Sequence, residues 1–439
     1  MVLLNRGLML KKSFLFLSCL VLFIGCGLWD NNSCQGTLYK APSLYTGAGN
    51  MIYVSYYTKN KSVDSNGTCI DNPANYSLVF AQSADDGSSW TKKIIASEIL
   101  TDDTTEIMSQ SLTVNTAGYI FITYVNTDNQ LVCSVSKDAG ATFYPVKLET
   151  SLGVRGHSIM TDYNGNVYVA YNTYNTSDTT DTSSVLLKVI KYRDGTETWE
   201  TAQTVDSTAN TGFAPSLTVT GNGRIFVSYY YRGTASSAGL MYARSDDAGS
   251  TWTRGIIKAG DGDVSGPLSW IISDTNNYLY VGYYDPNGYN GSDNSWTEKD
   301  NGTFKIAKSE DFGLTWSLHA VDDDVYTGKA NTLVPGMGGT NVNVCYGLLI
   351  NYTELYSTDN QILCSQSTNG GLTFSAPSVV DTGSTINTNV ANLTYLNMAM
   401  DFYNSYLYLA YSITNSDGTT NLKIAKSTDG VTWTKKNVY

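Results

Sequence analysis

One short motif is repeated along most of the chain and constrains its fold more than any other feature. The motif reads Ser, any residue, Asp or Asn, any residue, Gly, any residue, Ser or Thr, and an aromatic residue. Five copies keep this spacing, a sixth is shortened by one residue, and a degenerate seventh fills the one large gap. The copies end at Trp90, Phe143, Trp199, Trp252, Trp316, Phe374 and Trp433, which are separated by 53 to 64 residues. A period of this length indicates an array of similar supersecondary units.

Each unit also contains an apolar, aromatic-rich segment that reads as a buried β-strand. This segment ends at a tyrosine in every unit, namely Tyr56, Tyr124, Tyr171, Tyr229, Tyr283, Tyr346 and Tyr411. In most units a short strand begins ten residues earlier, at Ser43, Ser111, Ser158 and Ser216. Each unit therefore has four strands: a, the tyrosine-bearing b, c ending at the motif serine, and d starting at the motif aromatic residue. Four-stranded units repeated radially predict an all-β, seven-bladed β-propeller over residues 38–439.

The repeated motif resembles the Asp-box, or BNR, repeat of sialidases and related propellers, over nearly the whole chain after residue 37. The pattern suits a tight turn between strands c and d. Glycine permits positive φ, the acid and hydroxyl oxygens bond turn amides, and the aromatic ring packs beneath the hairpin. We therefore expect structural and not catalytic roles for the motif acids and amide, which are Asp85, Asp138, Asp194, Asp247, Asp311, Asn369 and Asp429.

The first residues have the layout of a targeting segment. Lys11 and Lys12 precede an apolar stretch over 13–24 that ends at Gly25 and Cys26. This stretch is short for a membrane span and resembles a bacterial lipoprotein signal. We expect residues 1–25 to be a signal peptide, Cys26 to be lipidated and residues 26–37 to form a tether, with ordinary secretion as the alternative. The expected location is the bacterial cell envelope, on the outer membrane, at the cell surface or in the periplasm.

The charge and the residue composition exclude several classes of function. The net charge of -12 becomes -15 when residues 1–25 are removed, because that segment holds three cations and no acid. Nucleic-acid binding needs a cationic face, so it is not expected. With only two histidines, a histidine-based metal centre is not expected either. We predict no cofactor, since an acidic rim would at most hold calcium through oxygen ligands, and we expect a monomer.

Candidate binding residues lie on the propeller face opposite the repeated turns. There the loops between strands b and c vary in length, which is typical of recognition loops on a rigid scaffold. Three of their aromatic residues, Tyr174, Tyr289 and Trp296, are candidates for stacking on sugars. The segments that enter strand a place further candidates near the centre of the ring, namely Lys40, Glu106, Arg155 and His157. Each also has an ordinary structural explanation, such as a solvated side chain or a hydrogen bond at a strand end.

The arginine content argues against sialidase activity. Sialidases carry an Arg-Ile-Pro motif before the first blade strand and two later arginines, which together hold the substrate carboxylate. This chain has Lys40, Ala41 and Pro42 at the equivalent place, and no arginine follows Arg254. Lysine lacks the planar fork that binds a carboxylate through two bonds.

The resulting functional prediction is a lipid-anchored module that binds or scaffolds glycans or proteins. The alternative is a glycoside hydrolase or polysaccharide lyase with a specificity other than sialic acid. Two carboxylates at a suitable separation would suffice for glycoside hydrolysis. The candidates, by position alone, are Asp103, Glu106, Asp261 and Asp263.

Five cysteines remain after Cys19 is removed with the signal and Cys26 is assigned to lipid. Cys345 on strand b and Cys364 on strand c are symmetric about the centre of their hairpin, so a cross-strand disulfide is predicted. A second bridge would join Cys34 to Cys69. Cys133 is expected to be buried and free.

Overall fold

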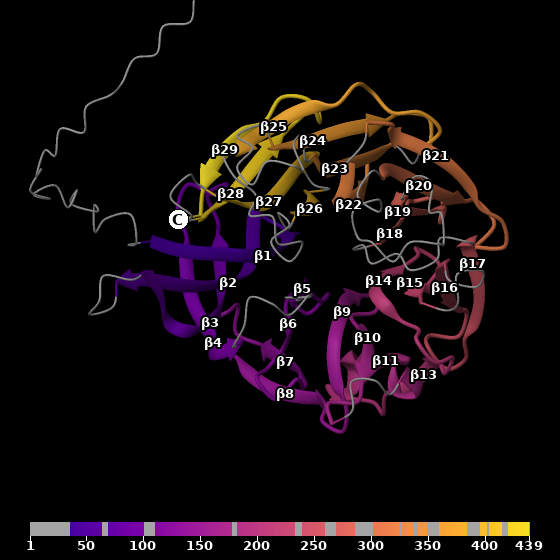
Figure 1. Ribbon diagram of the computed structural model, residues 1–439, viewed down its shortest axis with the longest axis horizontal. Helices are drawn as coiled ribbons and strands as arrows, with labels where there is room; N and C mark the ends of the chain where they lie inside the picture. Colours follow the sequence, from indigo (N-terminus) through magenta and orange to yellow (C-terminus); the bar gives the residue numbers. More distant parts are fainter. Residues whose placement is uncertain are drawn as a thin grey trace, which may run out of the picture.

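The computed structural model describes residues 36–63, 69–100, 110–177, 182–232, 239–259, 269–285, 302–324, 327–336, 341–348, 360–383, 396–401, 404–414 and 420–438. These residues form seven antiparallel sheets arranged around a common centre (Figure 1), which confirms the seven-bladed β-propeller. In the described part of the chain, no helix has the length and apolar character needed to cross a bilayer.

Blades 1 and 2 have four strands each, whereas the outer strand of blade 3 is divided into two. Blade 1 contains β1 (Gly36–Gly47), β2 (Met51–Val63), β3 (Cys69–Ser83) and β4 (Thr91–Leu100). Blade 2 contains β5 (Gln110–Val114), β6 (Ile120–Val125), β7 (Leu131–Ser136) and β8 (Tyr144–Glu149). Blade 3 contains β9 (Gly153–Thr161), β10 (Val167–Tyr174), the 3-10 helix η2 (Thr182–Ser184), β11 (Leu187–Arg193), the 3-10 helix η3 (Asp194–Thr196), β12 (Thr198–Trp199) and β13 (Gln203–Asp206).

The remaining four blades each have four strands in chain order. Blade 4 contains β14 (Phe213–Val219), β15 (Ile225–Tyr231), β16 (Gly239–Ser245) and β17 (Thr253–Ala259). Blade 5 contains β18 (Trp270–Ser273), β19 (Leu279–Asp285), β20 (Thr303–Ser309) and β21 (Ser317–Asp322). Blade 6 contains β22 (Thr327–Pro335), β23 (Val342–Leu348), β24 (Asn360–Ser367) and β25 (Ser378–Gly383). Blade 7 contains β26 (Leu396–Asp401), β27 (Tyr406–Thr414), β28 (Thr420–Ser427) and β29 (Thr434–Asn437).

The hydrophobic core lies between neighbouring blades. Strands β6 and β19 are buried along their whole length, because both faces of a middle strand contact an adjacent sheet. Apolar and aromatic side chains therefore occur on successive residues of these strands, where a half-exposed strand would alternate apolar with polar. One apolar cluster joins blade 1 to blade 7 and includes Tyr39, Val54 and Tyr408. The ring thus closes by the same kind of packing that joins the other blades.

Polar contacts reinforce this closing seam. Asp86, in the c–d turn of blade 1, accepts hydrogen bonds from the hydroxyl of Tyr408 at 2.5 Å and from Lys426 Nζ at 2.8 Å. Lys436 Nζ donates to the Asp86 carbonyl at 2.8 Å. Residues 36–40 pair with β2 of their own blade. Figure 1 shows β1 beside β26 and β27.

Three details of the expected blade pattern are corrected by the structure. The outer strand of blade 3 is split into β12 and β13, both paired with β11. Strands β2 and β3 extend far into the connection between strands b and c, where Asn60 pairs with Asn72. Strand a begins before its serine in blades 1 to 4, at Gly36, Gln110, Gly153 and Phe213.

Six of the c–d turns share one hydrogen-bond pattern. In blade 2, Asp138 accepts from the Thr142 amide at 2.8 Å and from the Ser136 hydroxyl at 2.8 Å. Ser136 in turn accepts from the Gly140 amide at 2.9 Å. Gly140 has φ +87°, and a Cβ there would lie 2.6 Å from a ring carbon of Phe80. The same acid or amide position is used by Asp85, Asp247, Asp311, Asn369 and Asp429.

Blade 3 departs from this pattern. Asp194 opens the helix η3 and accepts a hydrogen bond from Asn115 Nδ2 of blade 2 at 2.7 Å. Glu197, with φ 54°, accepts from the hydroxyl of Tyr119 and pairs with Lys137 at 2.6 Å. The acid of the degenerate motif therefore connects two blades, whereas the corresponding acid or amide of the other six copies bonds its own turn.

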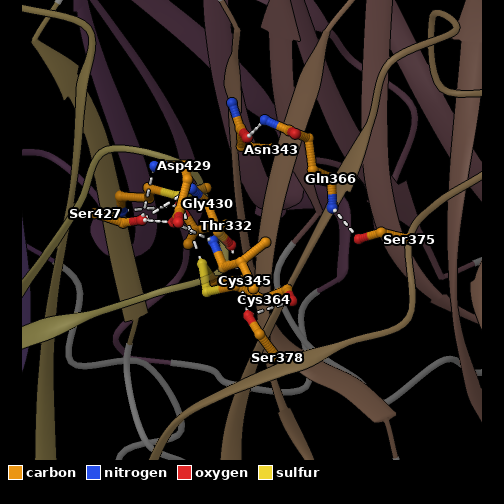
Figure 2. The surroundings of a disulfide bond; sticks show 12 residues. Thr332, Asn343, Cys345, Cys364, Gln366, Ser375, Ser378, Ser427, Asp429 and Gly430 are labelled. Carbon is orange, nitrogen blue, oxygen red and sulfur yellow. Dashed lines mark hydrogen bonds between the residues drawn. A yellow bond between two sulfur atoms is a disulfide. The ribbon is translucent and has the colours of Figure 1, made fainter.

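Blade 6 contains the disulfide predicted from the pairing of its strands. Cys345 of β23 faces Cys364 of β24, and the two Cα atoms are 4.1 Å apart. Figure 2 shows this bridge beside the c–d turn of blade 7, where Ser378 Oγ lies within hydrogen-bond distance of the carbonyls of Cys364 and Gly430. Cys133 is buried and free, and burial raises the pKa of its thiol. Cys26 and Cys34 lie outside the described residues, so the Cys34 to Cys69 bridge stays a prediction.

Candidate functional site

The two faces of the propeller are built differently. The a–b and c–d turns lie on one face, which we call the box face. The b–c loops and the connections from strand d to the next strand a lie on the other, which we call the crossing face. The ends of all seven inner strands meet the centre of the ring at the crossing face, so side chains from several blades converge there.

Four inner strands are kinked near this face. The pairing of strand a with strand b shifts register in β1, β9, β14 and β22. In two of them the kink holds an alanine with φ 47°, Ala41 and Ala214, each followed by proline. An alanine in this left-handed region is under local strain. A β-bulge bends the strand and redirects neighbouring side chains, so the residues before these kinks need not follow the alternation of a regular strand.

Hydroxyl groups join the inner strands of neighbouring blades. In each case a Ser or Thr oxygen accepts the backbone N–H of the next blade's strand a. The pairs are Ser43 with Leu112 (3.0 Å), Ser158 with Leu217 (3.2 Å), Ser216 with Ile271 (3.1 Å) and Thr332 with Met398 (3.1 Å). These bonds satisfy N–H groups at the free edge of each inner strand, which would otherwise lack a partner. The inner wall of the ring is therefore fixed independently of the outer loops.

Two cation–aromatic pairs lie at the contact between blades 3 and 4. The Arg155 guanidinium carbon is 4.5 Å from the centre of the Tyr174 ring, and that of Arg232 is 4.1 Å from the centre of the Phe213 ring. The positions are equivalent, because Arg155 and Phe213 each stand three residues before the strand-a serine. Tyr174 and Arg232 likewise stand three residues after the strand-b tyrosine. In blade 3 the cation is on strand a and the ring follows strand b, whereas in blade 4 the ring is on strand a and the cation follows strand b.

His157 is buried directly beside this region. Its side chain is 7% exposed, and burial lowers its pKa to about 4, an effect that a hydrogen bond with the Thr123 backbone partly opposes. The imidazole is therefore neutral at physiological pH. This agrees with the structural interpretation of His157 and separates it from the partly exposed Arg155.

Acids at the crossing ends of the outer strands connect neighbouring blades. The strand-b tyrosine of one blade donates to an acid at the end of strand d in the preceding blade. The four described pairs are Tyr171 with Glu149 (3.3 Å), Tyr229 with Asp206 (2.8 Å), Tyr346 with Asp322 (2.7 Å) and Tyr411 with Asp381 (2.8 Å). In these four seams the ring of the strand-b tyrosine fills the space between blades and its hydroxyl bonds the acid.

Most of these acids are also paired with cations. Asp381 is 2.8 Å from Lys423 Nζ and 3.0 Å from Lys435 Nζ. Burial raises the pKa of Asp381, but hydrogen bonds from both lysines and Tyr411 outweigh it, so the net shift is downward. Similar balances lower the pKa of Glu149 and Asp206. These carboxylates are ionised at neutral pH and engaged in holding blades together.

Several predicted site residues lie outside the described part of the chain. These are Glu106, Tyr289 and Trp296, together with the candidate acids Asp103, Asp261 and Asp263. Lys40 is placed in β1, opposite Tyr57, and its side chain is not described. The structure brings Arg155 together with Tyr174, and the neighbouring Gly156 lies against Ala214 and Pro215 of blade 4. In the described ranges, no group of three or more His, Cys, Asp or Glu side chains is placed to hold a metal ion.

The fold is shared with proteins that act on or bind carbohydrates. No protein-family model and no curated protein matches the chain. Among solved structures, it is similar to a lectin from Burkholderia pseudomallei, with a TM-score of 0.55, 12% identity and coverage of 92% of this chain and 99% of the lectin. An ulvan lyase from a new polysaccharide lyase family, bound to a GlcA–Rha3S saccharide, gives a TM-score of 0.53 at 12% identity, covering 92% and 93%. A Hadza microbial sialidase gives 0.50 at 15% identity, covering 87% and 78%.

The chain is thus a seven-bladed β-propeller with sialidase-like structural neighbours. At this level of identity the likeness shows the fold alone. The sequence analysis did not identify Phe213 and Arg232 as site residues. The available signal was the repeated Ala-Pro-Ser-Leu at 41–44 and 214–217, which aligns Phe213 with Lys40 and Arg155.

Proposed function

We propose that this propeller is a glycan-binding protein that recognises its ligand on the crossing face, near the contact of blades 3 and 4. The observation that carries the proposal is that two arginines each lie on an aromatic ring in blades 3 and 4, where the inner strands β9 and β14 are kinked. Rings with adjacent hydrogen-bond donors are the usual elements of a sugar site. The neighbouring structures support a carbohydrate-related role, because they include a lectin, a lyase and a sialidase.

Catalysis is the less favoured function, because four of the described acids of the crossing face are paired with cations. Glu149, Asp206, Asp285 and Asp381 are each paired with lysine or arginine. An acid that protonates a leaving group needs a raised pKa, whereas Glu149, Asp206 and Asp381 have lowered ones. These acids stabilise the contacts between blades.

A glycan array and a hydrolysis panel together test the proposal. The purified full-length chain is expected to bind a subset of glycans, and the same glycans are expected to remain intact after prolonged incubation. A matched control is Arg193→Gln, which changes an exposed arginine paired with Glu200 in blade 3. Arg155→Gln is expected to weaken glycan binding at least 10-fold, and Arg193→Gln is expected to leave it unchanged. Release of sugar from the panel, or an array without specific signal, would contradict the proposal.

We further propose that the protein is anchored to the bacterial cell envelope through lipid on Cys26. The support is the sequence of residues 1–26, which places basic residues, an apolar stretch and Gly25-Cys26 in lipoprotein order. Labelling with radioactive palmitate is expected for the wild-type chain and is expected to disappear in Cys26→Ala. An unlabelled wild-type chain would show that the protein is secreted without a lipid.

A further inference from the structure

We propose a second binding site, for neutral saccharides, on the box face where blades 2 and 3 meet. Its side chains are Tyr119 and Lys137 of blade 2 and Tyr192, Glu197 and Trp199 of blade 3. The site lies on the face opposite the glycan site proposed above and does not depend on it.

The degenerate repeat of blade 3 releases a hydroxyl from the turn. In a regular copy the motif serine bonds its own turn, as Ser136 does with Asp138 at 2.8 Å. Tyr192 takes the place of that serine at the end of strand c. Its longer side chain lies against Phe121 of blade 2, with 5.0 Å between the ring centres. The exchange of serine for tyrosine therefore moves a hydroxyl from the turn to the contact between two blades.

The Glu197 carboxylate brings polar groups of both blades to one position. The Tyr119 hydroxyl donates to its Oε1 at 2.9 Å, and Lys137 Nζ donates to its Oε2 at 2.6 Å. The side chains of Lys137 and Glu197 are 46% and 47% exposed, so a ligand can reach them from the box face. An exposed ion pair contributes little to stability. A ligand can therefore replace one of its bonds at small cost.

The Tyr192 hydroxyl is the group of this cluster that points to a ligand. Tyr192 is 3% exposed, and in the part of the chain that the structure describes its hydroxyl has no hydrogen-bond partner. A buried polar group without a partner is rare and costly. Burial raises the pKa of Tyr192, and the charges of Lys137, Glu197 and Asp194 also act on its phenol. The hydroxyl is therefore protonated at neutral pH and lies within the field of the same cluster.

The charges of the cluster select a neutral ligand with several hydroxyls. Lys137 repels a cation, and Glu197 and Asp194 disfavour an anion. The ammonium group donates, the carboxylate accepts and the Tyr192 hydroxyl does both. Adjacent sugar hydroxyls also donate and accept, so one can bridge Lys137 and Glu197 while its neighbour bonds Tyr192. The partly exposed ring of Trp199, 5.4 Å from that of Tyr192, adds an apolar surface.

Chemical footprinting locates the site, and calorimetry measures its affinity. The full-length chain is acetylated at lysine with and without methyl glycosides of glucose, galactose, mannose, xylose and rhamnose. At least one glycoside is expected to slow acetylation of Lys137 about 5-fold or more and to leave Lys147, an exposed lysine of the same blade, unprotected. For that glycoside, Tyr192→Phe is expected to weaken binding about 3- to 10-fold, the range for one hydrogen bond. Glu197→Gln is expected to weaken it at least as much, and Arg193→Gln is expected to have no effect.

The variant Tyr192→Phe separates a binding role from a structural one. It removes a hydroxyl without a partner in the described residues, so its melting temperature is expected to stay unchanged or to rise. Equal affinity of Tyr192→Phe and the wild type, or equal acetylation of Lys137 with and without every glycoside, would overturn the inference. Protection of Lys137 that disappears in Arg155→Gln would also overturn it, because the ligand would then bind on the crossing face. The crossing-face proposal is tested by Arg155→Gln on the array, so either site can fail while the other stands.

Discussion

Acids on the two faces of this propeller stabilise it in different ways. On the box face, Asp138 accepts hydrogen bonds from its own turn, and those bonds lower its pKa to about 2. On the crossing face, Asp381 bonds a tyrosine and a lysine of the next blade and a further lysine of that blade's outer strand. The motif acids of the six regular box turns therefore stabilise a turn, whereas the paired crossing-face acids stabilise the contact between blades. Loss of the second kind is expected to cost more, because it leaves the buried Tyr411 hydroxyl and two partly exposed lysines without their acceptor.

The substitution Asp381→Ala should have the largest effect. Breaking a buried ion pair typically costs about 3 to 5 kcal/mol. Since the side chains of Lys423 and Lys435 are 21% and 41% exposed, the expected loss of unfolding free energy is at the lower end, about 3 kcal/mol. Chemical denaturation measures it, with Asp138→Ala as the box-face control and a smaller loss expected. Equal losses in the two variants would remove the distinction between the faces.

His157 and the box-face acids should lose their contributions to stability at different pH values. The pKa of His157 is lowered to about 4 from 6.5, so the unfolded chain binds the proton first. His157 therefore contributes stability that is fully present above pH 6.5 and is lost as the pH falls towards 4, by about 2 to 3 kcal/mol. The box acids Asp85, Asp138 and Asp247, with pKa values of about 2, lose their contribution only below about pH 4.

Denaturation midpoints collected from pH 7 to pH 2 measure this difference. The variant His157→Gln is expected to flatten the profile between pH 6.5 and 4 and to leave the fall below pH 4 unchanged. A profile of the variant that parallels the wild type throughout would show that His157 does not titrate in this way.

A glycine substitution isolates the packing of a box turn. Gly140→Ala places a Cβ 2.6 Å from the Phe80 ring at φ +87°, so we expect both backbone strain and a clash, together about 2 kcal/mol. Gly118→Ala in the same blade has φ +78° and no atom within 4 Å of the new Cβ, so it measures backbone strain alone. Thermal unfolding of the two variants gives the difference. An identical shift would mean that the ring under the turn moves freely.

The smallest expected effect is a gain of stability in blade 2. Thr123 pairs with Cys133 as Cys345 pairs with Cys364 in blade 6. Thr123→Cys is therefore expected to form a second cross-strand disulfide and to stabilise the fold by about 1 kcal/mol. Mass spectrometry after alkylation without reductant detects the bridge, with Thr113→Cys, on the adjacent strand β5, as a control that cannot pair. Alkylation of both cysteines in Thr123→Cys would refute the expectation.

The same comparison explains how much of the fold could be predicted from sequence. The bonds of a box turn join residues two to four positions apart, so every copy repeats the same letters and the seven blades can be counted directly. The tyrosine of strand b repeats for a similar reason, because each blade places it in the same seam. The disulfide was predictable, since the pairing of two adjacent strands fixes which residues face each other.

Contacts between blades are harder to predict from the sequence than the box turns. The cation opposite the crossing-face acid is Lys188 in one seam, Arg254 in another and Lys423 in a third. Two positions can supply it, because Lys188 and Lys423 lie on strand c opposite the strand-b tyrosine and Arg254 lies on strand d, so the spacing repeats in only some blades. The pairing of Arg155 with Tyr174 and of Phe213 with Arg232 was missed for the same reason: the two blades exchange the roles of cation and ring, and a search for identical residues does not detect an exchange.

The hydroxyl bonds between inner strands have a consequence for engineering. Ser43, Ser158, Ser216 and Thr332 link consecutive blades through a side-chain hydroxyl and a backbone N–H of the inner strands, so none of these links depends on the length or sequence of a b–c loop. Recognition segments grafted between strands b and c would therefore be held on an intact inner ring. Libraries randomised at those positions should keep the melting temperature of the parent protein while binding different ligands.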